Sequence, residues 1–204
     1  MISTDQITGV VLAGGRGSRM GGVDKGLQPF RGAPMAAHVV ARLAPQVGGL
    51  MINANQNLDR YAAFGLPVWP DETPDFAGPL AGLQTALRHC ATPYLATAPC
   101  DSPFLPADLV ARLASALRQA DADLAVAVTG DGESRQPHPV FCLLKTGLLP
   151  HLTAFLQDGG RKVDAWYRSL KVVEVRFADE DAFRNINTLE ELRRYEADRT
   201  DQMN

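Results

Sequence analysis

Residues 10–27 read Val10-Val11-Leu12-Ala13-Gly14-Gly15-Arg16-Gly17-Ser18-Arg19-Met20-Gly21-Gly22-Val23-Asp24-Lys25-Gly26-Leu27. An apolar strand runs into a glycine-rich loop that also carries three cations, Arg16, Arg19 and Lys25. Glycine lets the backbone adopt positive φ and approach a ligand closely, so successive amide groups can point at phosphate oxygens while the cations neutralise charge. This stretch therefore predicts a binding loop for a polyphosphate.

Two common phosphate-binding motifs do not explain this loop. A Walker loop requires Gly-Lys-Ser/Thr because the hydroxyl group binds magnesium, whereas Gly26 follows Lys25 here. The dinucleotide-binding fingerprint requires a third small residue where Met20 stands, and an acidic residue after the second strand, where the sequence has Asn53. The first motif fails and the second fits poorly.

Around this loop, apolar runs of strand length alternate with amphipathic helical segments. We expect strands over residues 7–12, 48–53, 68–69, 93–98, 124–128, 137–144 and 172–177, with helices between successive strands except at a polar turn over residues 129–135. A closing helix is expected to begin at the capping box Thr188-x-x-Glu191. Such alternation is typical of α/β proteins. The sequence predicts a Rossmann-like, three-layer, wound and mostly parallel sheet, with an antiparallel strand in the C-terminal half.

Polar and small residues follow several of these strands. Gly14, Asn53 and Asp71 each leave a strand end, and ligands of open α/β sheets gather at the carboxyl ends of the strands. Gly78 and Gly82 flank the first turn of the helix that carries Leu80, Leu83 and Leu87. A helix start favours anions, although tight packing of this helix on the sheet is the alternative explanation for the glycines.

Asp101 follows the strand at 93–98 and lies between Pro99 and Pro103. The two prolines fix φ and remove competing N–H donors, so the carboxylate is expected to be held stiffly at a strand end. Magnesium commonly binds one or two carboxylates together with substrate phosphates and water, which makes Asp101 the candidate ligand. A cap for the helix that begins near Pro106 is the alternative.

The sequence is similar to the molybdenum cofactor guanylyltransferase family of nucleotidyltransferases. The similarity extends over nearly the whole chain, in the segments Leu12-Ala13-Gly14-Gly15, Arg19-Met20-Gly21-Gly22-x-Asp24-Lys25-Gly26, Asn53-Ala54-Asn55, Pro70-Asp71, Asp75-Phe76-x-Gly78-Pro79-Leu80-Ala81-Gly82, Cys100-Asp101-x-Pro103-Phe104-x-Pro106 and Asn185-x-Asn187-Thr188. A single glycine-rich loop would be weak support, but this ordered set is specific.

The resemblance implies a single nucleotidyltransferase domain over residues 1–204, with a GTP-binding half at about 1–105 and a molybdopterin-binding half at about 106–204. It implies transfer of GMP from GTP to molybdenum-molybdopterin with release of pyrophosphate, and a requirement for Mg²⁺ held by Asp101. Catalysis is expected from Lys25, Arg19 and Asp101, with a solvated loop charge as the alternative for each cation. The implied GTP-binding residues are Leu12, Ala13, Gly14, Gly15, Lys25, Asn53, Asp71, Gly78, Gly82 and Asp101.

The acceptor half is less well defined by the sequence. Candidate residues for binding the phosphate and the polar pterin are Arg135, His138, Arg161, Lys162, Asn185 and Asn187. Trp166 could stack on the pterin, but an aromatic residue at helical spacing is more often part of the core. For Asn53 and Asp71 the structural alternatives are a turn cap and a solvated turn.

Composition limits the classes of partner. The net charge of −3 argues against a nucleic-acid surface, and no apolar run reaches the roughly 20 residues of a membrane span. The cysteines Cys90, Cys100 and Cys142 are far apart, so they predict neither a disulfide framework nor a zinc site. We expect a cytoplasmic enzyme with small-molecule substrates, which interacts with molybdenum-insertion proteins and with apo-molybdoenzymes or their chaperones.

Three other functions remain open at the level of sequence. A cytidylyltransferase acting on the same pterin is the nearest, although Gly14-Gly15 and Pro79-Leu80-Ala81-Gly82 resemble the guanine-specific branch. A sugar-phosphate nucleotidyltransferase would use a hexose 1-phosphate as acceptor. A GTP-binding regulator without turnover is the alternative from a different class.

Overall fold

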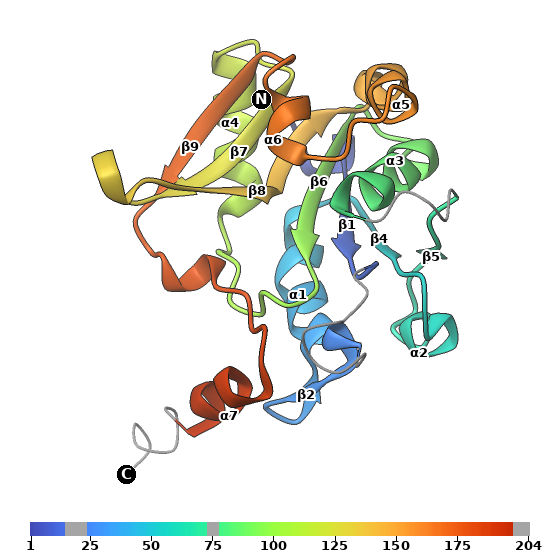
Figure 1. Ribbon diagram of the computed structural model, residues 1–204, viewed down its shortest axis with the longest axis vertical. Coiled ribbons are helices and arrows are strands. Elements are labelled where there is room, and N and C mark those ends of the chain that lie inside the picture. The colour runs from blue at the N-terminus through green and yellow to red at the C-terminus, as the bar shows by residue number, and fades with distance from the viewer. Residues whose placement is uncertain (15–23, 73–77, 198–204) are drawn as a thin grey trace.

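A computed structural model describes residues 1–14, 24–72 and 78–197 of the chain (Figure 1). Within these residues, seven strands form one sheet in the order β5-β4-β1-β6-β8-β7-β9. They are β1 (Ile7–Leu12), β4 (Gly49–Asn53), β5 (Val68–Trp69), β6 (Tyr94–Pro99), β7 (Leu124–Thr129), β8 (Gln136–Lys145) and β9 (Val172–Phe177). β8 runs antiparallel to β6 and β7, and the other neighbouring pairs are parallel. The predicted wound sheet with an antiparallel strand in its second half is confirmed.

Helices cover both faces of this sheet (Figure 1). On one face lie α1 (Met35–Leu43) and α4 (Leu109–Gln119), and on the other lie α3 (Pro79–His89), α5 (Leu149–Gln157) and α6 (Val163–Tyr167). The short helix α2 (Leu58–Ala62) joins β4 to β5. The closing helix α7 (Leu189–Ala197) begins at the expected capping box, in which the Glu191 N–H donates to Thr188 Oγ1 at 3.0 Å.

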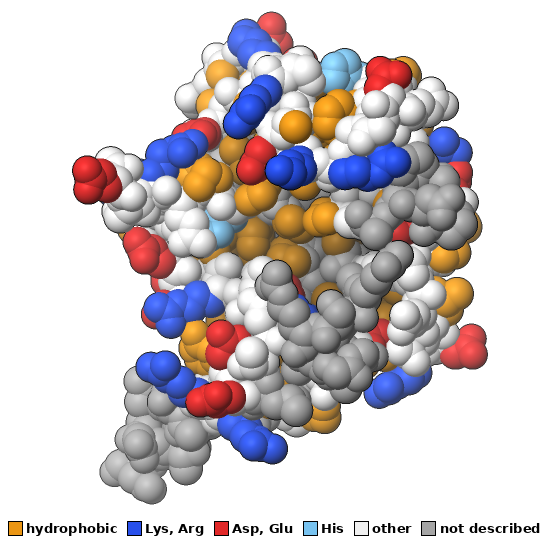
Figure 2. Space-filling model, viewed as in Figure 1, with side chains coloured by type: hydrophobic (Ala, Val, Ile, Leu, Met, Phe, Trp, Pro, Cys, Tyr) orange, Lys and Arg blue, Asp and Glu red, His pale blue; other side chains and the backbone are white. Residues whose placement is uncertain are grey.

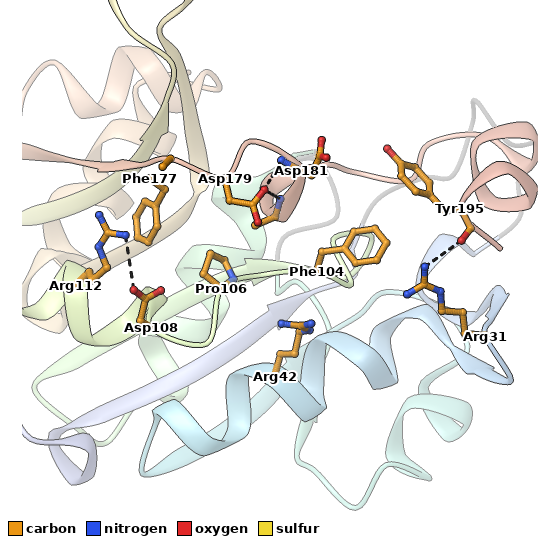
Figure 3. A pocket seen from close by; sticks show the side chains of 12 residues that line it. Arg31, Arg42, Phe104, Pro106, Asp108, Arg112, Phe177, Asp179, Asp181 and Tyr195 are labelled. Carbon is orange, nitrogen blue, oxygen red and sulfur yellow. Dashed lines mark hydrogen bonds and ion pairs between the residues drawn. The ribbon is translucent and has the colours of Figure 1, made fainter. Parts of the chain in front are cut away.

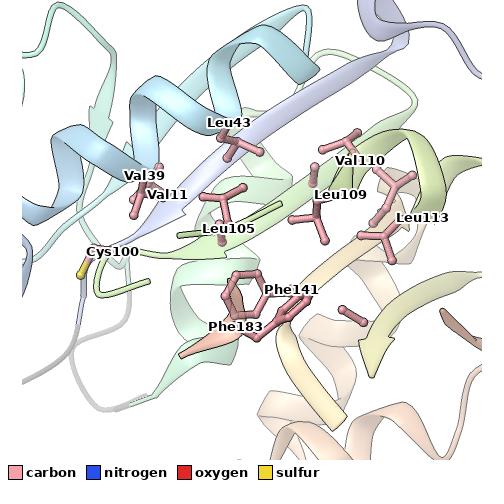
Figure 4. Close-up of a cluster of buried hydrophobic side chains, with 14 of the residues drawn as sticks. Val11, Val39, Leu43, Cys100, Leu105, Leu109, Val110, Leu113, Phe141 and Phe183 are labelled. Atoms are coloured by element: carbon pink, nitrogen blue, oxygen red, sulfur yellow. The ribbon is translucent and has the colours of Figure 1, made fainter. Parts of the chain in front are cut away.

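The core is divided by the sheet into two layers of apolar side chains. Val10 points into the layer beneath α3 and α5, and its neighbour Val11 points into the layer beneath α1 and α4. Figure 4 shows part of the second layer, where side chains from α1 and α4 meet those of the strands. Alternate residues of a strand face opposite sides, so a strand covered on both faces is apolar throughout, as residues 7–12 are.

A small hairpin was not predicted from the sequence. Strands β2 (Pro29–Phe30) and β3 (Ala33–Pro34) pair antiparallel through a turn in which Arg31 has φ +48° and Gly32 has φ +82°. Positive φ at both central residues is the geometry of a tight hairpin turn. Proline in each strand argues against a sheet, and this hairpin accommodates both because it is only two residues wide.

The carboxyl ends of β1, β4, β5, β6, β7 and β9 meet at one edge of the sheet, because these strands run in the same direction. The residues that follow these strands therefore come together there. Among the described residues, Cys100 and Cys142 are buried and Cys90 is half-buried, all three as free thiols. None of the described helices is long and apolar enough to span a membrane.

Candidate active site

Two asparagines and an aspartate form a cross-linked cluster at the ends of β4 and β5. Asn53 Nδ2 donates to Asp71 Oδ1 at 2.8 Å, and Asn55 Nδ2 donates to Asp71 Oδ2 at 2.8 Å. The Asp71 N–H in turn donates to Asn55 Oδ1 at 2.7 Å. Both carboxylate oxygens of Asp71 are thus held by amide donors, which fixes the orientation of the carboxylate without neutralising its charge.

Gly14 and Gly82 lie directly against this cluster. A Cβ at Gly14 would lie 3.0 Å from Asn55 Nδ2 and 3.1 Å from Asn53 Oδ1. A Cβ at Gly82 would overlap Asn53 Oδ1 and lie 3.1 Å from Leu12 Cδ2. Gly82 therefore permits close packing of α3 against the end of β4. Gly78, with φ +139°, is the exposed residue that precedes α3.

A second cluster, formed by Lys25, Asp101 and Asn187, lies at the end of β6. Lys25 begins a short 3₁₀ turn, and its Nζ donates to Asn187 Oδ1 at 2.7 Å and lies 3.4 Å from Asp101 Oδ2. The side chains of Lys25 and Asp101 are 20% and 12% exposed, so the ion pair is shielded but reachable from the edge. The Cys100 N–H donates to the Leu12 carbonyl at 3.0 Å, which ties this end of β6 to the end of β1.

The segment before α7 is fastened to the residues around Asp101. The Ile186 N–H donates to the Asp101 carbonyl at 2.8 Å, and Ser102 Oγ donates to Asn185 Oδ1 at 2.5 Å. Ile186 itself is fully buried beside Phe30 and Met35. These contacts place Asn185 and Asn187 at the Lys25–Asp101 pair, rather than among the other residues that were predicted to bind the pterin.

Burial controls the ionisation of Asp101 and its neighbour. Desolvation raises the pKa of the Asp101 carboxyl above its usual range, and Lys25 opposes this effect by stabilising the charged form. Burial also raises the pKa of the Cys100 thiol, with the Asp101 charge as the second cause. Cys100 is therefore a neutral, buried packing residue at neutral pH.

Two further candidates for the acceptor half, Arg135 and His138, lie where β7 ends and β8 begins. His138 Nε2 is hydrogen-bonded to Thr129 Oγ1 at 2.8 Å, its ring stacks on Phe183 at 4.7 Å, and burial lowers its pKa. Arg135 forms an exposed ion pair with Glu174.

On the α5–α6 side, Arg161 Nη1 donates to the Leu156 carbonyl at 2.9 Å, and the exposed Lys162 precedes α6. Trp166 is fully buried and donates to His151 Nδ1 at 2.9 Å, so it belongs to the core.

A mainly apolar recess lies at the end of β1, beside the start of α3. Figure 2 shows a hollow with hydrophobic side chains near the centre of this face of the molecule. The recess is lined by Leu12, Pro79, Leu80, Leu83, Thr97, Pro139, Val140, Cys142, Val163 and Tyr167. It reaches from the end of β1 and the start of α3 to β8 and α6, which connects the two predicted halves of the site.

A larger cavity, of about 620 Å³, lies elsewhere, between α1, α4 and the segment after β9 (Figure 3). Its arginines already have structural roles: Arg42 donates to the Leu105 carbonyl at 3.0 Å, and the Arg112 guanidinium lies 4.0 Å from the centre of the Phe177 ring. None of the described residues that the sequence predicts for the site lines this cavity.

Two predicted site residues, Gly15 and Arg19, lie outside the described residues. Conversely, the prediction of site residues omitted Asn55, Asp24 and Tyr61. Asn55 had a usable signal, because it is the second asparagine of the Asn53-Ala54-Asn55 triplet at a strand end. Asp24 stands in a segment that carries the family similarity, but nothing in the sequence links it to Tyr61, which lies 37 positions later and binds it.

The donor set around Asp101 is compatible with magnesium. Among the described residues, no group of three or more His, Cys, Asp or Glu side chains could hold a metal ion. Magnesium does not require such a group, because it is commonly bound by one or two carboxylates while substrate phosphates and water complete the octahedron. The partly shielded Asp101 carboxylate at the open strand edge meets this requirement.

The fold and the strand-end clusters define a nucleotidyltransferase. The family model of the MobA-like NTP transferase domain matches residues 9–173. Among solved structures, the molybdopterin-guanine dinucleotide biosynthesis protein A of Archaeoglobus fulgidus superposes with a TM-score of 0.77 at 23% identity, over 95% of this chain and 99% of that chain. The 4-diphosphocytidyl-2C-methyl-D-erythritol synthase of Anaerococcus prevotii has a TM-score of 0.77 at 11% identity, over 97% and 100%.

Relatives of higher sequence identity show to which family of nucleotidyltransferases the chain belongs. The molybdenum cofactor guanylyltransferase of Cupriavidus taiwanensis is 60% identical over 198 residues, which cover 97% of this chain and 100% of the relative. The Bordetella petrii protein of the same name is 61% identical over 192 residues, which cover 94% and 98%. The chain belongs to the molybdenum cofactor guanylyltransferase family.

Proposed function

We propose that this enzyme transfers GMP from GTP to molybdenum-molybdopterin, which releases pyrophosphate and forms the molybdopterin guanine dinucleotide cofactor. The observation that carries the proposal is the Lys25–Asp101 pair at the end of β6, adjoining the end of β1 and on the same sheet edge as the Asn53–Asp71 cluster. A cation and a carboxylate side by side would suit the binding of a triphosphate and its magnesium ion, which supports the proposal. The relatives named above support the choice of substrates.

The proposed reaction is a displacement at the α-phosphorus of GTP. An oxygen of the molybdopterin phosphate forms a bond to that phosphorus, and the bond to the oxygen bridging the α- and β-phosphates breaks. The attacking phosphate is already ionised at neutral pH, so no general base is required. Catalysis then depends on positioning and on charge stabilisation, which Lys25 supplies as pyrophosphate leaves.

Asp101 is the residue that would hold Mg²⁺ in this scheme. The bound ion would neutralise charge on the triphosphate. Lys25, 3.4 Å from Asp101, would share this task and hold the triphosphate beside the carboxylate. Asn187, which accepts from Lys25 Nζ at 2.7 Å, would fix the direction of the ammonium group. Arg19 and Gly15, from the glycine-rich loop, complete the proposed phosphate-binding set.

Guanine recognition is assigned to the cluster at the ends of β1, β4 and β5. Guanine presents its N1–H and its amine as donors, so a selective site needs oxygen acceptors at fixed positions. Asp71 has two oxygens held in place by Asn53 and Asn55, and Gly14 gives a ligand close access to them. The backbone of Leu12 and Ala13 and the start of α3 at Gly78 and Gly82 form the rest of the proposed nucleotide site.

The acceptor is proposed to bind across the apolar recess, in the half formed by residues from about 106 to 204. Arg135, His138, Arg161 and Lys162 border this half, and Asn185 and Asn187 join it to the catalytic cluster. We further propose a cytoplasmic location. There the product would pass to apo-molybdoenzymes or their chaperones, and molybdenum-insertion proteins would supply the substrate.

Pyrophosphate release with molybdenum-molybdopterin and either GTP or CTP tests the proposal. We expect release with GTP and formation of the guanine dinucleotide, with CTP much less effective. A preference for CTP would indicate a cytidylyltransferase, and release with a hexose 1-phosphate in place of the pterin would indicate a sugar-phosphate enzyme. Tight GTP binding without any turnover would favour a regulator.

A further inference from the structure

Asp24 directly precedes Lys25 in the sequence, and its carboxylate is hydrogen-bonded to side chains of the α2 region. Asp24 Oδ1 accepts a hydrogen bond from the Tyr61 hydroxyl at 2.6 Å, and Asp24 Oδ2 accepts one from Asn57 Nδ2 at 3.0 Å. Tyr61 lies in α2 and Asn57 immediately precedes this helix. Both oxygens of Asp24 are therefore engaged by neutral donors of the α2 region, although Lys25 is the adjacent residue.

Tyr61 is a permanent donor in a rigid position. Its side chain is fully buried, and its ring packs edge-on against Phe64 with ring centres 6.0 Å apart. Burial raises the pKa of its hydroxyl, followed by the nearby Cys100 and Asp24, so the proton stays on the oxygen. The backbone of Asn57 has a left-handed conformation, with φ +52°.

The other neighbour of Lys25 is also packed on Tyr61. A Cβ at Gly26 would overlap the Tyr61 hydroxyl oxygen and lie 3.2 Å from both Cβ and Sγ of Cys100. Cys100 in turn precedes Asp101. The Tyr61 hydroxyl thus binds the residue before Lys25 and lies close against the residue after it, at the place where the turn packs on the end of β6.

We propose that Tyr61, assisted by Asn57, is a positioning residue for Lys25. By binding the Asp24 carboxylate, it keeps the anion adjacent in sequence away from the ammonium group, so that Nζ points to Asp101 and Asn187. Released from Tyr61 and Asn57, Asp24 competes with Asp101 for Lys25. The kinetic part of this inference rests on the proposed function, whereas its structural part does not.

Tyr61→Phe removes the hydroxyl group and keeps the ring in the core, so a folded variant is expected. The direct readout is the NMR signal of ¹³C-dimethylated lysines, since the chain contains only four lysines, Lys25, Lys145, Lys162 and Lys171. The Lys25 signal, assigned with Lys25→Arg, is expected to shift in Tyr61→Phe and in Asn57→Ala. The other three signals are expected to stay in place.

The kinetic readout separates positioning from general stability. We expect kcat to fall about 10-fold in Tyr61→Phe, because the lost hydrogen bond is made to a charged group, while KM for GTP changes much less. In a Lys25→Ala background the same substitution is expected to cause no further loss, because Tyr61 acts through Lys25. Tyr94→Phe, at the opposite end of β6, is the matched control and is expected to leave kcat unchanged.

An unchanged Lys25 signal in Tyr61→Phe would overturn the inference, as would an unchanged kcat or a full additional loss in the Lys25→Ala background. Failure of the proposed function has a different signature. The parent enzyme would then transfer no GMP to molybdopterin, while the lysine spectra would still report whether Tyr61 positions Lys25.

Discussion

Two opposing requirements act on the side chain of Asp101, one from burial and one from the proposed metal site. Burial disfavours its charge, yet the proposed magnesium site requires the charged form, and Lys25 at 3.4 Å compensates only in part because the pKa remains raised. Functional sites commonly contain groups that lower the stability of the folded protein. Replacing the carboxylate by an amide separates the two demands.

We expect Asp101→Asn to lower kcat by about 100-fold or more, because the removed group acts on charge that develops in the transition state. The midpoint of thermal unfolding is expected to stay the same or rise, since the amide carries no buried charge and its oxygen still accepts from Lys25. Pyrophosphate release and differential scanning fluorimetry measure the two effects. Retention of full turnover would contradict the assigned role.

We expect His138 to make the stability of the protein depend on pH. Its pKa is lowered because burial favours the neutral ring, an effect that nearby Glu180 opposes only in part. As pH falls through the usual histidine value of about 6.5, the unfolded chain takes up a proton before the folded chain does. The free energy of unfolding is therefore expected to decline between that pH and the lower folded pKa.

His138→Gln removes this titration and keeps a side chain that can bind Thr129. We expect the loss of stability between pH 7 and the acid range to be shallower in the variant than in the parent. Urea unfolding at a series of pH values checks this, and parallel curves for the two proteins would argue against the titration of His138 as a cause.

At the scale of elements, the contact between α3 and β4 positions the nucleotide-side cluster. Gly82→Ala would drive a methyl group into Asn53, which holds Asp71. We expect KM for GTP to rise about 10-fold, and stability to fall by about 1–3 kcal/mol through overpacking. Steady-state kinetics and urea unfolding measure these changes. Gly147→Ala is the control, because no atom lies within 4 Å of its added Cβ, and equal effects in the two variants would refute the packing argument.

The elements themselves were largely predictable from the sequence. Leu80, Leu83 and Leu87 predicted a helix face, and Pro137 and Pro139 marked the start of a strand that proved to be antiparallel. The β2–β3 hairpin escaped prediction because positive φ at Arg31 is not encoded by residue type as clearly as at glycine. Local periodicity and turn chemistry decide such features, and these act over only a few residues.

The candidate site was predictable where it follows strand ends and not where it depends on long-range contacts. Asn53 and Asp71 lie together, as expected from the parallel strands. The pterin-binding role of Asn187 stays a prediction, and its contact with Lys25, 162 positions earlier, was not predicted. No spacing in the sequence encodes that contact, because it arises from the burial of Ile186 and the course of the chain into α7.

On the scale of the whole molecule, the two predicted halves share one sheet. β6 of the first half pairs with β8 of the second over residues 94–97, and β8 then pairs with β7. We expect a single cooperative unfolding transition, with calorimetric and van't Hoff enthalpies in agreement. Two resolved transitions in scanning calorimetry would show that the halves fold independently.

The reversal of β8 between β6 and β7 has a practical consequence for handling the enzyme. The strands on either side of β8 run in the same direction, so the edge of the sheet that holds Ile7, Tyr94 and Leu124 is opposite the edge of the proposed site. Figure 1 shows the amino terminus at that remote edge and α7 at the other. An affinity tag or a surface tether is therefore best attached through the amino terminus, which leaves the edge of the proposed site open.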